Sequence, residues 1–278
     1  MVMSVSFSFS KAIDCKLNQN DAAKVANTIT VDKSGHGNFM TIQEAVDHIP
    51  LNNDQWIRIH ANPGIYTEKV TIPEDKPCIL LEGSGYSQTT ITWNDHSRTD
   101  TSATFTVSPD NFVAKGIAFK NSYNRPVQQT AEAENAWTQA LAVRIYGDKS
   151  AFHQCAFMGF QDTIWDVKGR HYFNSCYIEG AVDFIWGSGQ SLYEDCSINS
   201  TAGRLAPLSS EGFITAQGRQ SPDDPSGFVF SGGSISGTGK TYLGRAYGPY
   251  SRVIFHGTTL GAVVVPQGWN AWKFQGQE

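Results

Sequence analysis

The sequence predicts an all-β fold of the parallel β-helix kind, a solenoid with one short helix near its N-terminal end. Short β-rich runs separated by Gly, Asn, Asp and Ser dominate the chain after a single helical segment. An internal repeat with a period near 20 residues occupies the middle third. The composition, with 40% hydrophobic and 17% charged residues, is that of a globular protein and excludes a disordered or collagen-like chain.

The helix is predicted from a capping signal. Thr41-Ile-Gln-Glu44 has the form of a capping box, and the apolar positions Ala45 and Val46 continue an amphipathic pattern. Pro50 cannot continue a helix, so the segment should end before it. A helix in this place would cap the N-terminal end of the solenoid.

The strands are predicted from short runs rich in β-branched and aromatic residues. Representative runs are Trp56 to Ile59, Cys78 to Leu81 and Val253 to Phe255. Little else in the chain has helical periodicity. These runs therefore predict an all-β fold, but they do not by themselves separate a solenoid from a sandwich.

The repeat favours the solenoid. An aromatic-x-x-Cys-x-apolar pattern occurs at Phe152 to Phe157, Phe173 to Ile178 and Tyr193 to Ile198, and its frame advances by 21 and then by 20 residues. Such a period predicts one coil per repeat, with equivalent residues stacked about 4.8 Å apart. A β-sandwich with accidental spacing is the alternative. Related fragments lie at Val113 to Phe119, Phe228 to Ile235 and Phe255 to Leu260.

Two carboxylates fall in register with this repeat. Asp162 follows Cys155 by seven residues, and Asp183 follows Cys176 by seven. Stacked coils would place the aspartates on one face roughly 5 Å apart, where each perturbs the pKa of the other. A single Asp in a Gly-rich turn is ordinarily a solvated turn residue. A pair in register within apolar surroundings is a candidate for catalysis.

Composition and cysteine spacing exclude several kinds of function. A formal net charge of -5 without a long Lys/Arg run predicts no nucleic-acid partner. No run approaches the roughly 18 apolar residues that span a membrane. The five cysteines and seven histidines form no metal-ligand spacing, so we expect neither a metal nor a cofactor. Cysteine pairing stays open, although Cys155 and Cys176 would lie in adjacent coils at a distance that permits a disulfide.

Several motifs, in order, resemble the plant pectin methylesterase (pectinesterase) family. The resemblance extends from about Thr30 over nearly the whole chain, and it implies a right-handed parallel β-helix and hydrolysis of methyl esters in pectin. The motifs are Gln139-Ala-Leu-Ala-Val-Arg144, Gly147-Asp-Lys-Ser-Ala-Phe152, Gly159-Phe-Gln-Asp-Thr-Ile-Trp165, Gly180-Ala-Val-Asp-Phe-Ile-Trp-Gly187, Ile214-Thr-Ala-Gln-Gly-Arg219 and Tyr242-Leu-Gly-Arg-Ala-Tyr247.

The resemblance implies a role for each catalytic position. Asp183 would be the nucleophile and Asp162 the general acid and then base. Gln139 and Gln161 would donate to the oxyanion, and Arg245 would hold Asp183 and lower its pKa. Without the resemblance, the residues favour a different interpretation: the glutamines would be ladder residues that satisfy backbone groups, and Arg245 would be a surface ion-pair residue.

The resemblance also implies substrate contacts, and this chain departs from the family at some of them. Implied contacts are Thr99, Gln139, Phe160, Arg245, Tyr247 and Trp269. Trp165, Trp186 and Trp272 could either pack in the core or face sugar rings. Gly-Arg-Ala-Tyr at residues 244 to 247 replaces the family's usual Gly-Arg-Pro-Trp, Trp186 replaces a usual Phe, and a polar insertion runs from Asn124 to Glu134.

We expect a single pectinesterase domain over residues 1–278, with residues 1–29 peripheral or poorly ordered. Homogalacturonan is the expected partner, an inhibitor protein is a second one that the resemblance allows, and the chain should be a monomer. The resemblance implies secretion to the plant cell wall. The N-terminal sequence does not contribute to this expectation, because no signal peptide is evident in it. The alternatives are a β-helix glycoside hydrolase acting on polygalacturonate and a pectin-binding protein with weakened catalysis.

Overall fold

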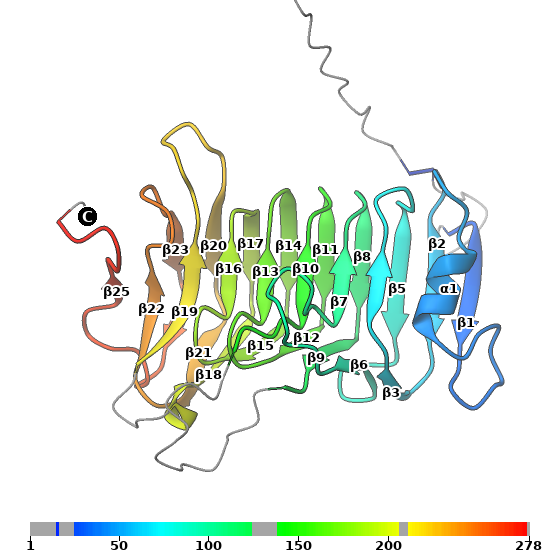
Figure 1. Ribbon diagram of the computed structural model, residues 1–278, viewed down its shortest axis with the longest axis horizontal. Helices are drawn as coiled ribbons and strands as arrows, with labels where there is room; N and C mark the ends of the chain where they lie inside the picture. Colours follow the sequence, from blue (N-terminus) through cyan, green and yellow to red (C-terminus); the bar gives the residue numbers. More distant parts are fainter. Residues whose placement is uncertain (1–14, 17–24, 124–137, 206–210, 277–278) are drawn as a thin grey trace, which may run out of the picture.

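The computed structural model describes residues 15–16, 25–123, 138–205 and 211–276. Three parallel sheets run side by side along the length of the molecule (Figure 1). Each coil contributes one strand to each sheet, so hydrogen-bonded neighbours are one coil apart in the sequence. This arrangement is a parallel β-helix, and it confirms the predicted fold class. The expected insertion from Asn124 to Glu134 lies outside the described residues.

The first sheet has nine strands, and the other two have eight each. The first sheet contains β1 (Asn27–Val31), β2 (Ile57–Ala61), β5 (Ile79–Gly83), β8 (Phe112–Lys115), β11 (Ser150–His153), β14 (Arg170–Asn174), β17 (Gln190–Glu194), β20 (Gly227–Ser231) and β23 (Val253–His256). The second contains β4 (Val70–Ile72), β7 (Phe105–Val107), β10 (Val143–Ile145), β13 (Ile164–Asp166), β16 (Ile185–Gly187), β19 (Gly212–Gln217), β22 (Thr241–Arg245) and β25 (Trp269–Asn270). The third contains β3 (Gly64–Thr67), β6 (Thr89–Trp93), β9 (Ala118–Asn121), β12 (Ala156–Met158), β15 (Tyr177–Gly180), β18 (Ser197–Thr201), β21 (Ser234–Thr238) and β24 (Thr259–Leu260).

Helix α1 (Ile42–His48) covers the N-terminal end of the solenoid (Figure 1). Thr41 and Glu44 form the reciprocal capping box that the sequence predicted, and the helix ends at His48, before Pro50. Ile42 and Val46 are buried on the face that packs against the first coils. A 3₁₀ turn, η1 (Ala202–Arg204), is the other helical element of the described residues.

The repeat sets the register of the coils. Phe152 pairs with Phe173, which pairs with Tyr193, as the 21- and 20-residue spacing predicted. Their rings stack inside the solenoid, with centroids 5.0 and 4.4 Å apart. The stack continues through Phe230 and Phe255, at 4.6 and 4.3 Å. One aromatic ladder therefore joins five successive coils of the interior.

The cysteines of the repeat are buried and free, so no disulfide joins Cys155 to Cys176. Two of the thiols lie near a carbonyl of the preceding coil to which they can donate: Cys176 Sγ is 3.4 Å from the Phe152 oxygen, and Cys196 Sγ is 3.5 Å from the Phe173 oxygen. Burial raises the pKa of the Cys176 thiol.

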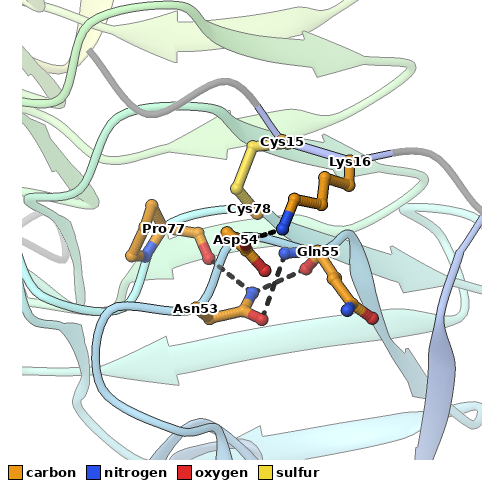
Figure 2. The surroundings of a disulfide bond; sticks show 7 residues. All are labelled: Cys15, Lys16, Asn53, Asp54, Gln55, Pro77 and Cys78. Carbon is orange, nitrogen blue, oxygen red and sulfur yellow. Dashed lines mark hydrogen bonds and ion pairs between the residues drawn. A yellow bond between two sulfur atoms is a disulfide. The ribbon is translucent and has the colours of Figure 1, made fainter. Parts of the chain in front are cut away.

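A disulfide instead joins Cys15 to Cys78, 63 residues apart (Figure 2). Beside it, Lys16 pairs with Asp54 through both its side chain and its backbone N–H. Together with β1, these bonds attach the described part of residues 1–29 to the β-helix. The expectation that residues 1–29 are peripheral or poorly ordered stays a prediction. Among the described residues of that segment, Cys15, Lys16 and the first residues of β1 are held to the solenoid by these contacts. Neither distant cysteine pairing nor edge pairing with β2 could be predicted from the local sequence pattern.

Most of the core is a single hydrophobic cluster that fills the solenoid from α1 to the last coils. A smaller cluster of Phe160, Ala181, Ala202 and Leu205 lies under the connection between the third and second sheets. No helix of the described residues is both long and apolar enough to cross a membrane.

Candidate active site

Asp162 and Asp183 lie in adjacent coils, each in the short connection that leads into the second sheet. Gln161 and Val182 form a parallel bridge, and the Asp162 N–H donates to the Val182 oxygen at 3.1 Å. The two aspartates follow this bridge directly, so the register predicted from the 21-residue spacing holds. Both residues are largely buried, with exposed fractions of 7% for Asp162 and 8% for Asp183.

Both aspartates have left-handed backbone conformations, with φ angles of 63° for Asp162 and 48° for Asp183. Most residues with a Cβ avoid this region, whereas Asp and Asn are enriched in it. Each left-handed bend lies in the connection between a strand of the third sheet and a strand of the second. The same local backbone geometry therefore recurs at both aspartates in adjacent coils.

Arg245, the last residue of β22, binds Asp183 through a two-pronged contact. Its Nε donates to Asp183 Oδ1 at 2.8 Å, and its Nη2 donates to Oδ2 at 2.5 Å. The guanidinium lies over the ring of Phe213 at 4.3 Å and over that of Trp272 at 4.0 Å. The Arg245 guanidinium is therefore held by two hydrogen bonds to one carboxylate and by two aromatic rings. This arrangement excludes the interpretation of Arg245 as an exposed surface ion-pair residue.

The two carboxyl groups differ in acidity because their surroundings differ. Burial, followed by the negative charge of Asp183, raises the pKa of Asp162 well above its usual range, and Arg245 offsets only part of this. Burial also raises the pKa of Asp183, although the bonds from Arg245 oppose the rise. Arg245 thus lowers the pKa of Asp183, as expected, but burial outweighs this effect and the net change is a rise. Asp183 still ionises before Asp162.

A groove of about 630 Å³ opens above the aspartates on the second sheet. Its wall is aromatic: the rings of Trp165 and Trp186 stack 4.4 Å apart, and Tyr247 meets Trp186 edge to face at 6.1 Å. Tyr247 is 44% exposed. The lining residues are Arg98, Thr99, Asp100, Gln139, Gln161, Asp162, Trp165, Asp183, Trp186, Ala216, Arg245, Tyr247 and Trp272.

The groove brings together most of the residues proposed from sequence. Thr99, Gln139, Gln161 and Tyr247 all line it beside the aspartates. Among the described residues, no hydrogen bond joins either glutamine side chain to a neighbouring coil. The ladder interpretation therefore has no support in the described part of the chain.

Two sequence-proposed contacts lie outside the lining. Phe160 is only 4% exposed and packs in the small cluster under the coil connection. Trp269 pairs with Gly244, one position before the groove-facing Arg245, and its ring contacts Phe255 at 6.1 Å. Because successive strand residues face opposite sides, Trp269 covers the end of the core instead of the groove.

Sequence reasoning missed some groove residues and left others undecided. Arg98 and Asp100 were not proposed from the sequence. The one feature that could have indicated them is that they flank Thr99, which was proposed as a substrate contact. Trp165, Trp186 and Trp272 were undecided between core and surface, and the structure places all three at the groove. Trp272 thus takes the place expected for Trp269.

Arg144 lies one coil from the aromatic wall of the groove. Its guanidinium lies 4.5 Å from the Trp165 ring centre and donates to the Asp100 carbonyl and to the Tyr146 hydroxyl. Arg144 and Trp165 occupy paired positions on β10 and β13. The contact links the aromatic wall to the loop that carries Thr99.

No group of three or more His, Cys, Asp or Glu side chains in the described residues has an arrangement that could hold a metal ion. What the groove does contain is a buried carboxyl with a raised pKa beside a carboxylate that is held by arginine. Such a pair can combine an acid and a nucleophile at one site. Amide side chains beside it could donate hydrogen bonds to a developing negative charge.

Comparison with known proteins agrees with this geometry. Residues 28–277 match the family model described as Pectinesterase. Probable pectinesterase 29 of Arabidopsis thaliana is 50% identical over 250 residues, which cover 90% of this chain and 74% of the relative. Pectinesterase QRT1 of the same plant is 41% identical over 265 residues, covering 91% of this chain and 67% of the relative.

Solved structures show the same fold. The pectin methylesterase from carrot superposes with a TM-score of 0.79 at 32% identity, over 87% of this chain and 76% of that one. The pectin methylesterase from Aspergillus niger gives 0.75 at 28% identity, over 88% of this chain and 80% of that one. On the family match, the relatives and the shared architecture, this chain belongs to the pectinesterase family.

Proposed function

We propose that this pectinesterase hydrolyses the methyl esters of methyl-esterified homogalacturonan to pectate and methanol, with Asp183 as nucleophile and Asp162 as acid and then base. The observation that carries the proposal is the pair of adjacent buried carboxyl groups, of which Arg245 binds only Asp183. This asymmetry keeps Asp183 charged while Asp162 holds its proton. The match to pectin methylesterases supports the substrate class.

The first step is attack of an Asp183 oxygen on the C6 carbonyl carbon of a methylated galacturonate. A bond forms between that oxygen and the carbon, and the carbonyl electrons move to the oxygen. Gln139 and Gln161, on the groove lining, are suited to donate N–H groups to this oxyanion. When the carbonyl reforms, the bond to the methoxy oxygen breaks, and Asp162 gives that oxygen its proton, so methanol leaves.

The second step releases the sugar. Asp162, now a carboxylate, takes a proton from a water molecule, whose oxygen attacks the acyl carbon. The bond to Asp183 breaks, Asp183 recovers its charge, and the sugar leaves as a free acid that ionises. Arg245 binds the Asp183 carboxylate both before and after the reaction. It therefore positions Asp183 as the nucleophile of the first step and as the leaving group of the second.

Substrate contacts follow from the groove lining. Thr99 and Tyr247 retain their proposed roles, and the faces of Trp165, Trp186 and Trp272 replace Phe160 and Trp269 as platforms for sugar rings. The aromatic surface that Tyr247 provides is smaller than that of the tryptophan usual in the family.

The location and assembly of the protein are part of the same proposal. We place it in the plant cell wall, because its proposed substrate is a wall polysaccharide and because the Cys15–Cys78 disulfide suits an oxidising compartment. A single domain, a monomeric state and binding by an inhibitor protein are carried over from the resemblance. The sequon at Asn199 is compatible with secretion.

Product analysis tests the proposal against the glycosidase and binding-only alternatives. The protein should release methanol from methylated homogalacturonan and acidify the solution without creating reducing ends. Early formation of reducing ends, or depolymerisation of methyl-free polygalacturonate, would instead indicate a glycosidase. Tight binding without methanol release would indicate a protein that binds pectin without turnover.

Replacement of Gln161 tests the oxyanion role. Gln161→Ala should slow methanol release by roughly a hundredfold, as expected for the loss of one oxyanion donor. The variant should bind substrate with little change in KM, because the donor acts mainly in the transition state. A change confined to KM would return Gln161 to a binding role.

A further inference from the structure

The two carboxyl groups of the site differ in what holds them in place. Arg245 donates two hydrogen bonds to the Asp183 carboxylate. Among the described residues, no side chain and no backbone N–H donates a hydrogen bond to the Asp162 carboxyl. The position of Asp162 must therefore be set through its backbone and through the residues beside it in the chain.

Each aspartate lies in a tight turn that begins at a glycine and closes four residues later. One turn runs from Gly159 to Thr163, and the other from Gly180 to Phe184. A Cβ atom added to Gly159 would lie 2.7 Å from Thr163 Oγ1. A Cβ atom added to Gly180 would lie 2.2 Å from Phe184 Cβ. Both turns are closed so tightly that a side chain larger than that of glycine does not fit at their first position.

Thr163, which directly follows Asp162, links its turn to both neighbouring coils. The residue is fully buried, and its hydroxyl donates to the Glu179 carbonyl oxygen at 2.9 Å. Glu179 directly precedes the turn that carries Asp183. On the other side, the Thr163 carbonyl oxygen accepts a hydrogen bond from the Ala142 N–H at 2.9 Å. The hydroxyl therefore joins the two aspartate turns to each other.

We propose that Thr163 is a positioning residue for the reaction, because its hydroxyl fixes the turn that carries Asp162 against the turn that carries Asp183. The inference rests on the proposed function and adds to it a residue outside the groove. Neither Thr163 nor Glu179 lines the groove, so their hydrogen bond acts on the reaction through the position of Asp162. That position matters because a small misplacement of reacting groups costs a large factor in rate.

Thr104 provides a matched comparison in the same fold. The strands that follow the two threonines, β7 and β13, pair with β10 in matching register, so Thr104 occupies the position of Thr163 two coils earlier. Thr104 is also fully buried, and its hydroxyl donates to the Lys120 carbonyl oxygen at 3.1 Å. Its coil carries neither aspartate. Loss of this hydrogen bond should therefore change stability without changing the geometry of the acid and the nucleophile.

Four variants separate positioning from stability. Thr163→Val and Thr163→Ala remove the donor, Thr163→Ser keeps it, and Thr104→Val is the control. Methanol release from a methylated oligogalacturonate gives kcat and KM for each. Without the hydroxyl at residue 163, kcat should fall about tenfold or more while KM stays within about twofold, because the groove lining is untouched. Thr163→Ser should keep kcat within about threefold of the wild type. Thr104→Val should keep both constants and lose about as much thermal stability as Thr163→Val.

The pH profile gives a readout that a change in stability alone would not move. Asp183 and Arg245 are the charged groups that act on Asp162, and Arg98 and Asp100 are the other charged residues of the groove lining. When the two turns separate, Asp162 becomes better hydrated and lies farther from the Asp183 charge, so its raised pKa falls. Arg245, which lowers this pKa, has the smallest influence of the three and does not reverse the direction. The alkaline limb should move to lower pH in Thr163→Val and stay in place in Thr104→Val.

Each other outcome is decisive. A folded Thr163→Val or Thr163→Ala variant with unchanged kcat, or with an unmoved alkaline limb, would overturn the inference. So would an equal fall of kcat in Thr104→Val, or a kcat in Thr163→Ser as low as in Thr163→Ala. If neither donor-free variant folds while Thr104→Val does, Thr163 serves the fold and the inference is rejected. Absence of methanol release by the wild type would instead reject the proposed function itself.

Discussion

At the scale of single residues, the backbone of the two aspartates constrains what can replace them. Both occupy left-handed conformations that Asp and Asn tolerate far better than other residues with a Cβ. An alanine at either position would add backbone strain to the loss of the carboxylate. Asparagine keeps both the shape and the conformational preference, so it is the substitution that isolates chemistry.

Asp183→Asn should therefore abolish turnover while leaving the fold intact. The amide cannot form the acyl-enzyme, and it removes a buried charge that Arg245 partly compensates. We expect methanol release below about one hundredth of the wild-type rate, with a melting temperature within a few degrees of the wild type. Activity above that level in a folded variant would assign the nucleophile to another residue.

Arg245→Lys should cost far more than a conservative surface exchange. Lysine cannot reproduce the two-pronged contact with Asp183 or fill the space between Phe213 and Trp272. Loss of hydrogen bonds to a charged group corresponds to about tenfold or more in rate. A kinetic comparison with Arg170→Lys provides the matched control, because the exposed Arg170 guanidinium also forms a forked contact with a carboxylate, that of Asp148, but does not line the groove.

The same substitution should shift the pH profile in a defined direction. Burial raises the pKa of Asp183 and Arg245 opposes that rise, so a weaker partner lets the pKa rise further. Activity requires ionised Asp183, and its acidic limb should move to higher pH. The alkaline limb reports mainly the protonated form of Asp162, although the two titrations are coupled. An unmoved acidic limb would contradict the role given to Arg245.

The sequence predicted a site residue correctly where the repeat determined its position in the coil, and failed where the position depended on the register of a single coil. The repeat alone placed Asp162 beside Asp183, because residues at the same position in successive repeats lie next to each other in stacked coils. Nothing in the local pattern distinguished Trp269 from Trp272, which are three residues apart near the C-terminal end. The pairing of Gly244 with Trp269 decides between them, and that pairing depends on the register of the last coil.

At the scale of elements, strand existence was predictable and strand boundaries were not. The run Cys78 to Leu81 reads as one strand, yet β5 begins at Ile79, because Cys78 has a φ of 66° and bonds to Cys15. A difference of one residue at the end of a strand does not change which of its residues point into the core and which point outward. The disulfide itself could not be predicted, since five cysteines without spacing signals allow many pairings.

Removal of this disulfide should lower stability without changing the catalytic rate. The bond closes a loop of about 63 residues, for which chain entropy sets an upper limit of about 4 kcal/mol in the free energy of unfolding. A Cys15→Ser, Cys78→Ser double variant should melt at lower temperature, and reductant should destabilise the wild type but not the variant. Equal melting with and without reductant in the wild type would contradict this role.

At the scale of the whole molecule, stability is shared between coils that contact only their neighbours. The aromatic ladder from Phe152 to Phe255 joins five coils of the interior. A second link between coils is polar and fully buried: His171 Nδ1 is 2.6 Å from Asp166 Oδ1, and the Tyr193 hydroxyl donates to Asp166 Oδ2 at 2.9 Å. The network spans β13, β14 and β17.

The charge state of this network ties the folding equilibrium to pH. His171 Nε2 faces the Gly147 carbonyl at 2.9 Å, so both ring nitrogens lie beside acceptors and the imidazolium satisfies both. Burial lowers the pKa of His171, but the Asp166 charge and these hydrogen bonds outweigh burial and raise it. An unfolded histidine has a pKa of about 6.5.

Because the folded pKa is the higher one, stability from His171 is fully present below about pH 6.5 and is lost as pH rises through the folded value. Thermal unfolding of the wild type should therefore show a falling melting temperature above about pH 6.5. His171→Gln should be less stable, since it leaves Asp166 buried without a cation, and its melting temperature should vary less over pH 6.5 to about 8. That window lies below the ordinary cysteine pKa of about 8.5, so the buried thiols do not contribute to the slope. Equal slopes in the two proteins would show that the network holds no extra proton in the folded state.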